Sequence, residues 1–131
     1  MNNEMISFLE KYKFDKQLKK LNKKLKNKKV LIYGAGLLFQ AIKENYDLSK
    51  LNIIAISDQK FAENEEEYFA GYKTCKPADI FSLNPDYVLV STVRTISIIE
   101  YLRYVLLEDK EIKILPFVRK SIIDTIKEIW S

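Results

Sequence analysis

The sequence has no histidine, one cysteine (Cys75), three glycines and three prolines among its 131 residues. Without histidine, the chain lacks the usual general base, the Ser-His and Cys-His nucleophile pairs and the commonest metal ligand. One cysteine cannot form an internal disulfide and cannot supply a zinc site by itself. The scarcity of glycine and proline argues against long segments without structure. The most common catalytic arrangements are therefore missing from this chain.

Long apolar runs are also missing. No uninterrupted apolar run approaches the roughly 18 residues that cross a bilayer, and the opening MNNEMISFLE has no basic start of the secretory type. We therefore expect no membrane span and, with a lone cysteine, a cytoplasmic location. Apolar residues make up 47% and charged residues 31%, as in ordinary globular proteins, and the length fits one domain.

Positive charge is concentrated near the start, where ten lysines and one acid, Asp15, lie between Lys11 and Lys29. The segment has no arginine and few aromatic residues, so we interpret it as a solvated helix face and expect no nucleic-acid partner. Apolar residues at helical spacing predict one helix over residues 3–27. Residues 1–27 are thus expected to form a lysine-rich helix, and residues 28–131 the folded domain.

Strand and helix patterns alternate through the rest of the chain. The predicted strands are KKVLIYG, LNIIAISD, YKTC, DYVLVST and EIKILPF, and the predicted helices follow at LLFQAIKENY, from Pro77, at 94–107 and at 119–130. A helical turn is expected around 65–69. This alternation predicts an α/β domain with a mainly parallel sheet of about five strands, in the order 3-2-1-4-5, between two layers of helices. It corresponds to a three-layer Rossmann-like fold with added N- and C-terminal helices.

A short glycine loop lies between the first strand and its helix. Gly34 permits a tight turn, Gly36 allows close approach of a pyrophosphate, and the helix that begins at Leu37 offers free N–H groups to anions. Ala35 lies between the two glycines. The third position of the G-x-G-x-x-G pattern is Phe39, which puts the usual dinucleotide geometry in question. The segment predicts either a nucleotide site or a strand–turn–helix that only retains the glycines.

Polar residues follow two of the predicted strands. Asp58 comes 24 residues after Gly34 and suits the ribose hydroxyls of NAD rather than NADP, although Lys60 softens this preference. The alternative is a loop carboxylate that caps backbone N–H groups. Ser91 and Thr92 end another strand, where they either bind ribose or phosphate or N-cap the next helix.

The segments VLIYGAG, IIAISD, GYKT, PADI, DYVLVST and KILPF resemble, in order and spacing, the CapD-like group. This is the Rossmann-like domain of bacterial nucleotide-sugar dehydratases and epimerases of polysaccharide biosynthesis. The resemblance covers roughly residues 28–117. It implies that Gly34, Ala35, Gly36 and Asp58 hold NAD or, alternatively, a UDP-sugar. The family's glycine is Phe39 here.

The resemblance also implies a separate catalytic region with a Tyr-x-x-x-Lys signature. Two such spacings, Tyr12 to Lys16 and Tyr46 to Lys50, lie where neither tyrosine could reach a nicotinamide, so we expect no complete active site. The first hypothesis is a nucleotide-binding module that depends on a separate catalytic domain. The second is an interaction domain with a decayed site, which would form a homodimer or a complex. A third is a small complete sugar-modifying enzyme.

Overall fold

The chain begins with two helices rather than the single helix expected over residues 3–27. The structure is a computed structural model that describes residues 3–63, 66–106 and 111–130. Helix α1 spans Asn3–Lys11 and helix α2 spans Phe14–Lys24. Lys13 separates them in the left-handed conformation, with φ of 53°. Such a conformation is uncommon for a residue with a side chain and ends the first helix.

The centre of the molecule is a sheet of six strands in the order β3-β4-β2-β1-β5-β6. The strands are β1 (Lys29–Tyr33), β2 (Asn52–Ser57), β3 (Tyr68–Phe69), β4 (Tyr72–Cys75), β5 (Tyr87–Val90) and β6 (Lys113–Pro116). Strands β4, β2, β1, β5 and β6 pair in parallel, and β3 pairs antiparallel with β4. The strand order differs from the expected one by this added edge strand.

The connections between the strands contain the remaining helices. These are α3 (Leu37–Asn45), the 3-10 turns Gln59–Phe61 and Pro77–Asp79, α4 (Ile80–Leu83), α5 (Ile96–Tyr101) with a π-helical continuation at Leu102–Leu106, and α6 (Ile122–Trp130). Helices α5 and α6 begin later than the sequence indicated. The helical turn expected around 65–69 is wrong at Tyr68–Phe69, which form β3, and residue 65 lies outside the described residues. Residue 107, the expected end of α5, also lies outside the described residues.

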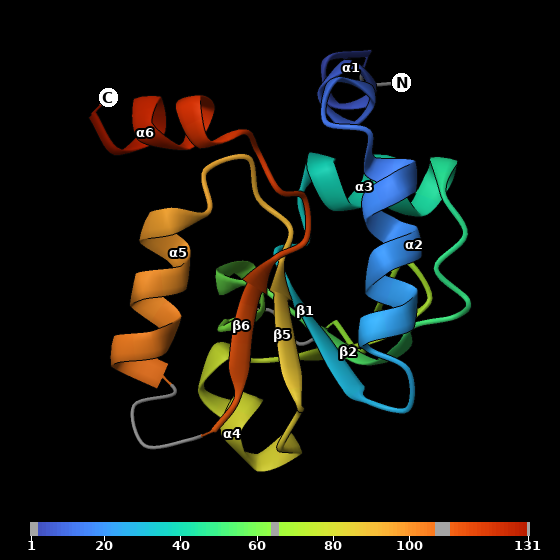
Figure 1. The fold of residues 1–131 in the computed structure, drawn as a ribbon. Coiled ribbons are helices and arrows are strands. Elements are labelled where there is room, and N and C mark those ends of the chain that lie inside the picture. Colours follow the sequence, from blue (N-terminus) through green and yellow to red (C-terminus); the bar gives the residue numbers. More distant parts are fainter. Residues whose placement is uncertain (1–2, 64–65, 107–110, 131) are drawn as a thin grey trace.

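Helices cover both faces of the sheet and make three layers (Figure 1). One core cluster joins α1, α2 and α3 to one face, with Leu9, Phe14 and Ile32 among its members. The other joins α4 and α5 to the opposite face, around Leu31 and Ile80. Because α1 and α2 share the first cluster with β1, they pack on the same sheet as the rest of the chain.

Strand β6 lies at the edge of the sheet. The backbone N–H of Lys113 donates to the carbonyl oxygen of Asp86, the residue before β5, and the N–H of Phe117 donates to that of Val90 at the end of β5. Along a parallel strand these groups alternate in direction, so those of Ile114 and position 116 point to the open edge. Position 116 is a proline, which has no N–H group.

Strands β1, β2 and β5 end side by side, because Tyr33 is in register with both Ser57 and Val90. Figure 1 shows α1, α3 and α6 at this end of the sheet, while α4 lies at the other. The glycine loop follows β1 here, Asp58 follows β2 and Ser91 follows β5. The order of the strands therefore gathers the candidate residues from three separate parts of the chain.

Candidate functional site

Gly34 occupies a position that no other residue fits. Its φ is +116°, in a region that side chains rarely adopt. A Cβ atom at this position would lie 2.9 Å from both the backbone oxygen and the Oγ of Ser91. The turn after β1 therefore needs glycine for its backbone conformation and for its contact with the end of β5.

Asp58 binds the glycine loop itself. Its Oδ2 accepts a hydrogen bond of 2.7 Å from the N–H of Ala35, and its Oδ1 accepts one of 3.1 Å from the N–H of Lys60. This is the backbone-capping role that the sequence left as an alternative. A carboxylate has roughly four acceptor positions. Two of them are used by these bonds, and the side chain remains partly exposed.

Lys60 completes the contact between the loop and the segment after β2, a role the sequence did not indicate beyond its nearness to Asp58. Its Nζ donates to the carbonyl oxygen of Ala35 at 2.6 Å. The same ammonium group lies 4.3 Å from the ring centroid of Phe69 on β3. Asp58 and Lys60 thus hold both polar groups of the Ala35 backbone, and a cation remains beside the loop.

Gly36 and Leu37 form the open side of the loop. Gly36 is the N-cap of α3, and a Cβ there would meet no atom of the described residues within 4 Å. Leu37 is 58% exposed although it is apolar. Among the described residues, no group accepts from the N–H of Gly36, Leu37 or Leu38. These donors and the helix dipole make this the part of the loop that is suited to an anion.

Phe39 turns away from the open side of the loop and into the core between α3 and the sheet. It is fully buried and meets the ring of Tyr72 edge to face, at a centroid distance of 5.9 Å. Where the G-x-G-x-x-G pattern has a glycine for close packing, this chain fills the space with a phenyl ring. The ring leaves the N–H groups at the start of α3 uncovered.

Ser91 and Thr92 do not cap α5, so that alternative is wrong. The Oγ of Ser91 donates to the carbonyl oxygen of Gly34 at 2.5 Å, and Thr92 donates to the carbonyl oxygen of Arg94 at 2.8 Å. Thr95 is the N-cap of α5 and makes no side-chain cap. The Oε2 of Glu128 accepts from the N–H of Ile96 at 2.9 Å instead. Glu128 lies 32 positions further along the chain, so no local pattern indicated it.

A second set of polar side chains lies at the same end of the sheet, on the face opposite to α3. The Nε2 of Gln59 donates to the hydroxyl of Tyr101 at 2.9 Å. Burial, with smaller effects from Asp58 and Tyr101, raises the pKa of Tyr33 to about 12. Ser57 is fully buried, and its Oγ has no hydrogen-bond partner in the described part of the chain. Tyr33 stays neutral at physiological pH and offers no base for proton transfer.

Five of the surface hollows formed by the described residues lie away from the glycine loop or touch only its edge. A hollow of about 830 Å³ between α1 and α3 reaches Leu37, together with Glu4 and Gln40. A hollow of about 430 Å³ includes Cys75, whose thiol pKa is raised to about 11 by burial and by Asp79. The other three are lined partly by lysines of α2 or lie at the opposite end of the sheet. Within the described ranges, no three Cys, Asp or Glu side chains converge as metal ligands.

No helix in the described part of the chain is long and apolar enough to cross a membrane. The fold and the site define a mainly parallel α/β domain with a glycine loop at the carboxyl end of its sheet. The chain belongs to the family described as C2185-like, N-terminal, whose model matches residues 26–102. The match begins at Lys26, just after α2, and runs to Leu102, so it includes the loop, Asp58 and Ser91. No curated protein matches the chain.

Proposed function

We propose that this domain binds a nucleotide or nucleotide sugar and works in cytoplasmic nucleotide-sugar or surface-polysaccharide biosynthesis, together with a separate catalytic domain. NAD is the first candidate ligand and a UDP-sugar the second. The observation that supports binding is the open loop at Gly36, where three backbone N–H groups have no partner among the described residues. A diphosphate placed there would accept from these groups at the positive end of α3. The pathway rests on the resemblance to the CapD-like Rossmann-like domains.

Under this proposal, the remaining candidate residues either hold the loop in place or make further polar contacts with the ligand. Ser91 and the Oδ2 of Asp58 fix the turn on which the free N–H groups depend. Asp58 has acceptor positions left for a ribose hydroxyl, and Lys60 would add positive charge near a phosphate. Thr92 is only partly buried and would lie toward the β5 side of the ligand.

Two substitutions at Gly36 separate binding from folding. Asp and Asn are both favoured at an N-cap, so Gly36→Asp and Gly36→Asn should each keep or raise stability by a few tenths of a kcal/mol. The aspartate also places a negative charge where the phosphate would lie. Ligand-observed NMR with NAD, NADP, UDP-sugars and CDP-sugars should show binding to the wild type, weaker binding to the asparagine variant, whose uncharged side chain competes for the same N–H groups, and loss of binding in the aspartate variant. A folded wild-type protein that binds none of them would refute the proposal.

An interaction domain with a decayed site is the second candidate function. It is favoured because Asp58, Lys60 and Ser91 all bond within the protein, and because Phe39 has replaced the packing glycine. Under this alternative, neither the wild type nor either Gly36 variant would bind any of these ligands in the NMR experiment.

A further inference from the structure

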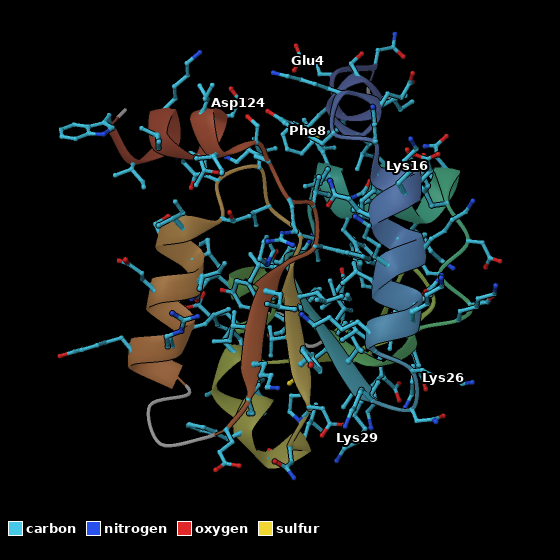
Figure 2. The ribbon with its side chains drawn as sticks, viewed as in Figure 1. Glu4, Phe8, Lys16, Lys26, Lys29 and Asp124 are labelled. Carbon is cyan, nitrogen blue, oxygen red and sulfur yellow. The ribbon has the colours of Figure 1, made fainter. Side chains whose placement is uncertain are left out.

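Helix α6 is attached to the domain by its polar side. The Tyr12 hydroxyl donates to Asp124, and the Nζ of Lys11 lies 3.4 Å from the same carboxylate. One turn further along, Glu128 forms an ion pair with Lys120 and accepts from the N–H of Ile96. Figure 2 shows Asp124 on the side of α6 that is turned toward α1. The acids of α6 are thus neutralised against the body of the domain.

The apolar side of α6 consequently faces solvent. Five large side chains on this short helix have exposed fractions from 47% to 84%: Ile122, Ile123, Ile126, Ile129 and Trp130. Together they expose on the order of 600 Å², the upper end for the largest apolar patch of a typical monomer. The apolar residues of α1 and α2 join the first core cluster, whereas the apolar side of α6 is exposed.

The spacing of these side chains is symmetric about Ile126. Ile123 and Ile129 lie three positions before and after it, and Ile122 and Trp130 lie four positions before and after. A twofold contact between identical surfaces requires that residue i meet j while j meets i. An antiparallel pair of such helices would bring Ile126 against its own copy and Ile123 against Ile129. The apolar surface is therefore complementary to itself.

We propose that α6 is a homodimer interface, in which it packs antiparallel on the α6 of a second copy with Ile126 at the twofold axis. Two patches of this size would bury about 1,200 Å², the lower limit for a specific interface. The expected dimer is thus concentration-dependent, with a Kd on the order of micromolar. A bilayer fits less well, because interfacial helices are rich in lysine and arginine. In α6 the only basic residue is Lys127.

Sedimentation equilibrium over a wide concentration range tests the interface. The wild type should shift from monomer to dimer as concentration rises. Ile126→Lys places two ammonium groups at the axis and should weaken association at least tenfold, with circular dichroism unchanged. Tyr104→Lys is the control, because Tyr104 is 81% exposed and lies outside α6. It should dimerise like the wild type. A wild-type chain that stays monomeric at every concentration would overturn the proposal, and flotation of that monomer with anionic vesicles would identify a bilayer as the occupant.

Cysteine cross-linking tests the register of the pair. In a Cys75→Ala background, Ile126→Cys should form a disulfide-linked dimer under mild oxidation, because each thiol meets its own copy. Ile123→Cys and Ile129→Cys should each cross-link poorly alone and efficiently when the two variants are mixed. Equal cross-linking at all three positions, or none at Ile126, would contradict the proposed arrangement.

Discussion

The carboxylate of Asp58 accepts a hydrogen bond of 2.7 Å from the backbone N–H of Ala35. The acid after β2 therefore holds the loop after β1, and any ligand at Gly36 would bind to a loop that is already fixed. This arrangement lowers the conformational cost of binding, because the donors need not be ordered by the ligand.

We expect Asp58→Asn to destabilise the domain by about 1–3 kcal/mol. The amide has only one acceptor atom, so either Ala35 or Lys60 would face an NH₂ group. Urea unfolding measures the loss, and hydrogen exchange should show faster exchange of the Ala35 amide. Glu44→Gln is the control, because Glu44 is an exposed acid of α3 and should change stability little. Equal stabilities of the two variants would contradict the role assigned to Asp58.

Alanine should have opposite consequences at the two loop glycines. Gly34→Ala forces a Cβ against Ser91 at a positive φ and should cost about 2–4 kcal/mol. Gly36→Ala enters open space and should stay within about 1 kcal/mol of the wild type. Urea denaturation midpoints measure both. A Gly34→Ala variant as stable as Gly36→Ala would show that the turn relaxes more easily than its contacts indicate.

Placing the third glycine of the G-x-G-x-x-G pattern at position 39 should damage the protein rather than improve a dinucleotide site. Phe39 is fully buried against Tyr72, so Phe39→Gly should cost about 3–5 kcal/mol through the cavity, with about 1 kcal/mol more from glycine in a helix. Leu37→Gly in the same helix should lose only the stability that glycine costs in a helix, without a cavity cost, because Leu37 is exposed. Thermal unfolding should separate the two variants clearly. If both lose the same stability, Phe39 does not fill the core as described.

The attachment of α6 should weaken in acid. Burial alone raises the pKa of Glu128, but hydrogen bonds from Lys120 and from the N–H of Ile96 lower it overall. A lowered folded-state pKa gives stability that is fully present above the unfolded value of about 4.3 and is lost as pH falls through the folded value. The stability difference between the wild type and Glu128→Gln should thus be constant near neutral pH and shrink below about pH 4.

Unfolding measured across this pH range tests the acid sensitivity, and hydrogen exchange in α6 should rise in parallel. Glu100→Gln is a suitable control, because Glu100 is exposed on α5. Its difference from the wild type should show no comparable change. If the stability difference between the wild type and Glu128→Gln stays unchanged in acid, the carboxylate of Glu128 does not hold α6.

The sequence predicted the features that depend on local patterns. Continuous apolar runs located β1, β2 and β5, and the glycines with Asp58 marked the end of the sheet where the candidate residues meet. The break at Lys13 was missed because it has no glycine, proline or asparagine at the left-handed position. The bond from Ile96 to Glu128 was missed because it joins residues that only the fold brings together. The apolar spacing of α6 was also found, but spacing alone does not indicate which way a helix faces.

Pro116 affects how this molecule can aggregate. A sheet recruits foreign strands through rows of free N–H and C=O groups at its margins, and proline at a margin interrupts that row. Along β6 only Ile114 has an outward N–H, and the opposite margin is the two-residue β3. Templated growth of amyloid-like fibrils is thus disfavoured at both margins. Fibril growth by strand addition should therefore be slow in concentrated solutions of the folded protein, even though its core is rich in leucine and isoleucine.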